Sequence, residues 1–179
     1  MHIALSYSYN STYHNDYLEN DLRSFGDTIT FIGPPADHKA GYDPRVPLSH
    51  LFSAWPGLPD LYLAIDPSDR YFPPGIEDLP VPTACWLGDV HLGHWREDVA
   101  QFFDIVFVPH KDYVARYRQV VGHDQVYWLP LYVSDHVRPV PDLPRIYDVG
   151  FVGNVVLAHR RTPRTRRLNL LSSSFHMNE

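Results

Sequence analysis

Six short apolar segments recur along the first 130 residues of the chain, and helix-like stretches separate several of them. The segments span residues 2–7, 28–32, 61–65, 83–87, 104–108 and 126–129. Several are continuous apolar runs, which is typical of strands that are covered on both faces of a parallel sheet. Together with the helical stretches, they predict a doubly wound, Rossmann-like α/β fold with a parallel sheet.

The helical stretches are predicted from apolar periodicity and from the residues that stop a helix. They span residues 13–25, 47–55, 95–103 and 111–121. Gly26 and Gly122 follow two of these stretches directly and are suited to ending a helix. Segments 33–47 and 66–80 are rich in proline and read as long loops.

The chain is predicted to divide into three parts. Residues 1–132 form the Rossmann-like domain, and residues 133–147 form a semi-rigid linker that contains three prolines. Residues 148–179 resemble the opening of another domain. A strand at 148–154 is followed by a helix that starts at Thr162-Pro163, with Thr as N-cap and Pro at the first helical position. This second domain is expected to be incomplete.

The composition narrows the class of protein. With 44% apolar and 20% charged residues, the chain is expected to be globular. Its net charge of −6 argues against general nucleic-acid binding, although five arginines gather in the last 20 residues. No apolar run approaches the roughly 20 residues that span a bilayer. The single cysteine, Cys85, lies in an apolar segment, reads as a core residue and favours a reducing cytoplasm.

Ligands of a doubly wound sheet bind outside the carboxyl ends of its strands. The residues that directly follow each predicted strand are therefore the candidates for a site. They are Ser8–His14, Gly33–Pro35, Asp66, Asp89–His94 and His110.

The densest polar cluster is Gly88–Trp95, which contains Asp89, His91 and His94. One interpretation is a recognition loop in which Asp89 or His91 binds a hydroxyl group or acts as a base. A second is structural, with Asp89 capping the next helix and the histidines in solvent. A third is a metal site of a phosphohydrolase built on Asp89, His91 and His94, since these residue types ligate zinc and similar ions.

Two further segments are candidates. Ser8–His14 contains no dinucleotide-binding glycine pattern, but its hydroxyl and amide groups suit a cleft. The structural alternative is that Ser11 or Thr12 caps the first helix. Near the other end, Gly150–Asn154 precedes an arginine-rich helix, where glycines and Arg160 and Arg161 suit a diphosphate. The alternative there is a solvated basic face.

The order of several motifs carries a family resemblance. They are Leu58-Pro59-Asp60-Leu61-Tyr62-Leu63, Pro82-Thr83-Ala84-Cys85-Trp86-Leu87-Gly88-Asp89, Phe103-Asp104-Ile105-Val106-Phe107-Val108, Val126-Tyr127-Trp128-Leu129-Pro130 and Asp148-Val149-Gly150-Phe151-Val152-Gly153-Asn154, followed by arginines. In this order they resemble the CgeB-like glycosyltransferases, which are enzymes of the two-domain GT-B type. The likeness covers most of the chain from about residue 58 onward.

The resemblance implies an acceptor-side first domain and a second domain that binds a nucleotide-sugar donor, without a metal or another cofactor. Asp89 and His91 would be catalytic residues that face the cleft. The acceptor side would be completed by Tyr9, Asn10, His14, Asp66, His94 and His110, and the donor phosphates would be bound by Gly153, Asn154, Arg160 and Arg161. The alternative is a non-catalytic binding module derived from such an enzyme.

The expected partners are a nucleotide-sugar donor and a sugar or glycan acceptor. A second copy of the chain is a further expected partner. Phe151, Leu168 and Leu171 would leave apolar surface on the incomplete second domain, and this favours a homodimer through residues 148–179.

Overall fold

The computed structural model describes residues 1–8, 16–35, 39, 41–43, 45–67, 72–131 and 144. The chain divides into two units, Met1–Arg138 and Pro139–Glu179. Every described helix and strand belongs to the first unit. The predicted second domain at 148–179, and all of the linker 133–147 except Pro144, lie outside the described residues.

Six parallel strands form one sheet, as predicted. They are β1 (His2–Ser6), β2 (Thr28–Phe31), β3 (Leu61–Ile65), β4 (Thr83–Trp86), β5 (Ile105–Val108) and β6 (Val126–Trp128). Their order is β2-β1-β3-β4-β5-β6, and every neighbouring pair is parallel. The direction of strand addition therefore reverses between β1 and β3, which is the switch point where doubly wound sheets bind ligands.

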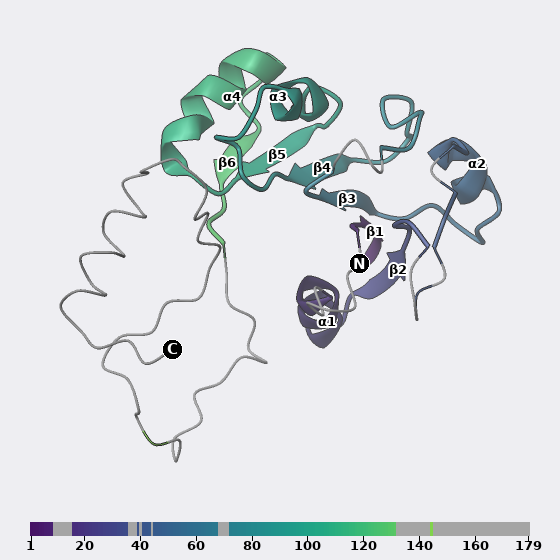
Figure 1. Cartoon of the computed structure of the whole chain (residues 1–179). Helices are drawn as coiled ribbons and strands as arrows, with labels where there is room; N and C mark the ends of the chain where they lie inside the picture. Colours follow the sequence, from purple (N-terminus) through teal and green to yellow (C-terminus); the bar gives the residue numbers. More distant parts are fainter. Residues whose placement is uncertain are drawn as a thin grey trace, which may run out of the picture. The chain divides into compact units, whose positions relative to one another are not determined.

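Helices lie on both faces of this sheet. They are α1 (Tyr17–Ser24), α2 (Leu48–Ser53), α3 (Trp95–Ala100) and α4 (Val114–Val121), and a short 3-10 turn, η1 (Lys111–Tyr113), precedes α4. Figure 1 shows α1 on one side of the sheet and α3 and α4 on the other. Because connections between parallel strands are right-handed, the reversal between β1 and β3 places the helices on opposite faces. Within the described ranges, no helix combines the length and the apolar character needed to cross a bilayer.

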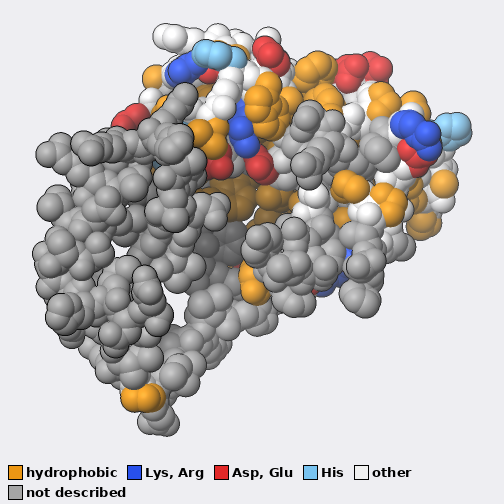
Figure 2. Space-filling view, viewed as in Figure 1, with side chains coloured by type: hydrophobic (Ala, Val, Ile, Leu, Met, Phe, Trp, Pro, Cys, Tyr) orange, Lys and Arg blue, Asp and Glu red, His pale blue; other side chains and the backbone are white. Residues whose placement is uncertain are grey.

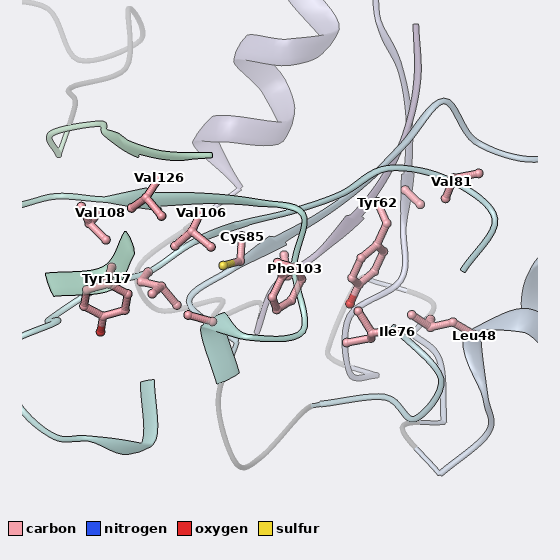
Figure 3. Close-up of a cluster of buried hydrophobic side chains, with 14 of the residues drawn as sticks. Leu48, Tyr62, Ile76, Val81, Cys85, Phe103, Val106, Val108, Tyr117 and Val126 are labelled. Carbon is pink, nitrogen blue, oxygen red and sulfur yellow. The ribbon is translucent and has the colours of Figure 1, made fainter. Parts of the chain in front are cut away.

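The larger core lies on the face that α2, α3 and α4 cover (Figure 3). Tyr62, Cys85 and Val106 point into it from three neighbouring strands, and each is at most 1% exposed. Phe52 of α2 and Tyr117 of α4 pack against the same cluster. Burial on this face therefore explains why every second residue of these strands is apolar.

The opposite face is covered less completely. Ile3, Leu5 and Ile29 form a smaller core beneath Leu22 of α1. Farther along, Leu63, Ile65, Trp86 and Phe107 line a hollow of about 450 Å³ beside α1. Figure 2 shows hydrophobic side chains in a recessed part of the surface. The expectation of strands covered on both faces holds at β1, whereas the side chains of β3 and β5 alternate between buried and half-buried.

Candidate functional site

The carboxyl ends of β3, β4 and β5 meet at one edge of the sheet. Ile65 pairs with Trp86 and Trp86 with Phe107, so the residues that follow these strands are neighbours. The predicted residues Asp66, Asp89, His91 and His110 lie along this edge, and all four are exposed. These residues follow the strands at the positions that the sequence predicted, and their role in a site stays a prediction.

Asp66 joins the ends of β3 and β4. Its amide donates a hydrogen bond to the carbonyl of Trp86 over 2.7 Å, and its carboxylate oxygen Oδ1 accepts one from the amide of Gly88 over 3.0 Å. The backbone of Asp66 has a φ of 42°, the left-handed region that aspartate enters more readily than most residues. This conformation turns the chain at the strand end, where the carboxylate can reach the next strand.

The loop from Gly88 to His94 carries Asp89 and His91. Val90 is buried and anchors it, and the amide of Leu92 donates to the carbonyl of Asp89 over 2.8 Å. The residue at the N-cap of α3 is His94, so the alternative that Asp89 caps this helix is wrong. Because the turn uses the backbone carbonyl of Asp89, the carboxylate is left at the surface.

His91 and His110 form a pair of rings. Their centroids are 5.5 Å apart and their planes meet at 74°, and the ring of His110 also lies 6.1 Å from that of Tyr113. Imidazole both donates and accepts hydrogen bonds, and it exchanges protons near neutral pH. With the carboxylate of Asp89 on the same edge, the pair can bind hydroxyl groups and accept a proton from one of them.

His94 takes part in a different cluster, between α3 and α4. Its Nδ1 atom lies 3.5 Å from the carboxylate of Glu97 and 3.2 Å from Nη2 of Arg116. Arg116 also pairs with Glu97 at 2.5 Å. The described contacts of His94 therefore connect it to these two residues and not to the ring pair of His91 and His110.

Two charged residues that were not predicted as site residues are buried near strand ends, Arg96 near the end of β3 and Glu19 near the end of β1. Arg96, in the first turn of α3, is 8% exposed and lies 3.4 Å from the carboxylate of Asp66. Glu19, in the first turn of α1, is 7% exposed. The sequence does offer a signal for Glu19, because Glu19 and Arg23 are spaced at positions i and i+4 of a predicted helix and can form an ion pair. No comparable pattern marks Arg96, because burial of a single arginine depends on tertiary packing.

Glu19 is the centre of a polar network at the carboxyl ends of β1 and β2. Its carboxylate accepts hydrogen bonds from Tyr7 Oη over 2.9 Å, from Lys39 Nζ over 2.6 Å and from Arg23 Nη2 over 3.0 Å. Burial raises the pKa of Glu19, but these three hydrogen bonds outweigh burial and leave its pKa below the ordinary value. The network connects Lys39, which follows β2 in the chain, to Glu19 of α1.

Several predicted site residues lie outside the described residues. They are Tyr9, Asn10, His14, Gly153, Asn154, Arg160 and Arg161. The first described helix begins at Tyr17 with Asp16 at its N-cap, and Ser11 and Thr12, the predicted alternative caps, lie outside the described residues. The predicted helical periodicity extended upstream to Tyr13, which also lies outside the described residues.

A metal site was the third interpretation of the Asp89–His94 cluster. In the described part of the chain, no three histidine, cysteine, aspartate or glutamate side chains are grouped so that they could hold a metal ion. The metal-dependent alternative thus gains no support from the geometry of Asp89, His91 and His94.

Comparison with known proteins found no relative that would indicate a role for these residues. No protein-family model, no curated protein sequence and no solved structure matches this chain.

Proposed function

We propose that this chain is the acceptor-side part of a glycosyltransferase of the two-domain type and that it binds a sugar or glycan at the carboxyl edge of β3, β4 and β5. The donor is a nucleotide sugar, for which the sequence offers Gly153, Asn154, Arg160 and Arg161. A cytoplasmic location belongs to this proposal, in line with the single buried cysteine.

One observation carries the proposal. Asp89, His91 and His110 are exposed at the carboxyl edge of an all-parallel sheet, with the two imidazole rings 5.5 Å apart. A sugar presents several hydroxyl groups that both donate and accept hydrogen bonds. A carboxylate accepts only and a neutral imidazole does both, so this set matches such a ligand.

The same residues supply the chemistry that a transfer step needs. The acceptor hydroxyl forms a bond to the anomeric carbon of the donor while the bond from that carbon to the diphosphate breaks. The proton of the hydroxyl passes to Asp89 or His91, and the diphosphate leaves with the electron pair. The main contribution of the protein is then to hold both substrates in position and to stabilise the leaving charge.

Binding is tested first, on the full chain. Saturation-transfer NMR with a panel of neutral monosaccharides and disaccharides should identify a ligand. Asp89→Asn and His91→Gln should each weaken its binding by about tenfold, which corresponds to the loss of one hydrogen bond to a charged or polar partner. His50→Gln, an exposed histidine on α2, is the control and should change nothing. Full affinity in both edge variants would contradict the proposal.

Transfer separates an enzyme from a binding module. Incubation of the full chain with nucleotide sugars and the identified acceptor should release nucleoside diphosphate, and Asp89→Asn should slow this release. Binding without any release would favour the non-catalytic module. A homodimer through residues 148–179 is a further part of the proposal, and light scattering on the full chain and on a chain that ends at Pro144 tests it.

A further inference from the structure

Arg96 is a buried guanidinium at the edge where the proposed ligand binds. The residue is 8% exposed, and it is one of two described residues that carry a buried polar side-chain atom without a hydrogen-bond partner among the described residues. That atom is its Nε. The position of Arg96 follows from the Gly88–His94 loop, which leads from the end of β4 into α3.

Two contacts hold the guanidinium within the described part of the chain. Its Nε lies 3.4 Å from Oδ1 of Asp66, and its Cζ atom lies 4.3 Å from the centre of the Trp95 ring. The same Oδ1 already accepts a hydrogen bond from the amide of Gly88 over 3.0 Å. Asp66 is therefore a shared and distant counter-ion for Arg96.

The neighbouring carboxylate does not compensate for this. Glu97 follows Arg96 in α3, but its carboxylate pairs with Arg116 at 2.5 Å and lies 3.5 Å from His94. An arginine has five N–H donors in a fixed fork, and a buried cation without good partners destabilises the fold. A ligand that accepts hydrogen bonds from the guanidinium of Arg96 would supply the partners that this buried cation lacks.

We propose that Arg96 binds an oxyanion of the ligand, either a phosphate or a carboxylate group on the sugar, and that the Asp66 carboxylate occupies this place in the free protein. This inference rests on the proposed function, because the oxyanion is a group of the sugar that the edge binds. The guanidinium fork matches both anions in a bidentate manner.

The exposure of the two side chains suits an exchange of this kind. The side chain of Asp66 is 47% exposed, whereas that of Arg96 is 10% exposed, so the partner that can move into solvent is Asp66. Within the described part of the chain, the only hydrogen bond of the Asp66 side chain is the one that its Oδ1 accepts from the amide of Gly88, so a ligand that replaces the carboxylate would have to break this one bond. Asp89 and His91 remain available for the hydroxyl groups of the same ligand.

The test measures affinities of the full chain by calorimetry. The probes are glucose 6-phosphate, glucuronate, methyl glucoside and inorganic phosphate, and circular dichroism checks each variant for folding. The wild type should bind one of the two anionic sugars about tenfold or more tightly than the neutral one. Arg96→Met should abolish this preference, Arg96→Lys should retain part of it, and Asp66→Asn should strengthen anion binding. The exposed Arg45 gives the matched control, Arg45→Met, which should change nothing.

The outcomes separate this inference from the proposed function. If no sugar binds but inorganic phosphate binds in an Arg96-dependent manner, the anion site stands and the sugar-binding proposal fails. Equal affinity for anionic and neutral sugars in the wild type, or an unchanged preference in a folded Arg96 variant, overturns the anion site. If Arg96→Met does not fold, weaker anion binding by Asp66→Asn overturns it instead.

Discussion

The amide of Gly88 donates a hydrogen bond to Oδ1 of Asp66 over 3.0 Å, and the carboxyl group of Asp66 fills the place that a side chain at Gly88 would take. A Cβ atom at Gly88 would lie 3.0 Å from three atoms of that carboxyl group. The close approach that connects the ends of β3 and β4 therefore favours glycine at this position, because an added Cβ would make the carboxyl group of Asp66 shift.

Gly88→Ala is expected to displace the Asp66 carboxylate and to lower the free energy of unfolding by about 1 kcal/mol, the typical value of one hydrogen bond. The chain should still fold, because the displaced group is the end of an exposed side chain. Urea denaturation measures the change. Gly57→Ala is the control, since nothing lies within 4 Å of its added Cβ. Equal stability of Gly88→Ala and wild type would show that the contact contributes nothing.

The network around Glu19 predicts a dependence of stability on pH. The pKa of Glu19 in the folded chain lies below its ordinary value of 4.5. Its stabilisation is therefore complete above that ordinary value and is lost as the pH falls through the lower, folded value. Glu19→Gln should destabilise the chain at pH 7 by about 1–3 kcal/mol, because charged hydrogen bonds are lost.

The pH profile of Glu19→Gln distinguishes this effect from simple loss of packing. The difference in unfolding free energy between variant and wild type should shrink below pH 4 and stay constant from pH 6 to 8. Asp43→Asn is the control, since Asp43 pairs with Arg45 at the surface, where ion pairs add little. A difference that is the same at every pH would show that the charge of Glu19 is not involved.

The sequence was sufficient to predict the elements of this fold because their signals are local. Each predicted strand overlaps its observed strand to within one residue or so at either end, from β1 to β6. The predicted end of α4 is confirmed for the same reason. Gly122 has a φ of 75° and ends the helix in the left-handed conformation expected of a helix-terminal glycine. The helix predicted from Lys111 starts with a 3-10 turn, η1, because its first residues form the tighter turn common at helix ends.

The tertiary partners were not predictable in the same way. The sequence placed Asp66, Asp89 and His110 at strand ends, and parallel pairing alone brings strand ends together. It did not indicate that Arg96 would be buried beside Asp66, or that Lys39 would reach Glu19 from a proline-rich loop. Such contacts depend on strand order and loop paths, which the apolar pattern does not encode.

The thiol of Cys85 is predicted not to react with thiol reagents in the folded protein. The residue is fully buried in the core between β3 and β5, and burial raises the pKa of its thiol well above the ordinary value. Because the thiolate is the reactive form, modification requires that the chain unfolds. Labelling with a thiol reagent should be slow in buffer and should accelerate along the urea unfolding curve. Fast labelling of the folded chain would contradict the buried position of Cys85.

Two buried tyrosines of the larger core give opposite predictions for the same substitution. Tyr62 and Tyr117 are both at most 1% exposed and both belong to the cluster beneath α3 and α4. The side chain of Ser6 interacts with the hydroxyl of Tyr62 and lowers its pKa against the larger effect of burial, whereas the hydroxyl of Tyr117 has no hydrogen-bond partner among the described residues. Burial, with the nearby charge of Glu97, raises the pKa of Tyr117 to about 12, so this hydroxyl stays protonated.

Tyr62→Phe should therefore lower the free energy of unfolding by about 1–2 kcal/mol, because Ser6 loses its partner inside the core. Tyr117→Phe should leave the stability unchanged or raise it by up to about 1 kcal/mol, since an unsatisfied buried hydroxyl group is removed and the ring is kept. The two variants have the same change in composition, so each is the control for the other. Thermal and urea denaturation measure both. A larger loss for Tyr117→Phe than for Tyr62→Phe would contradict the description of the Tyr117 hydroxyl as unsatisfied.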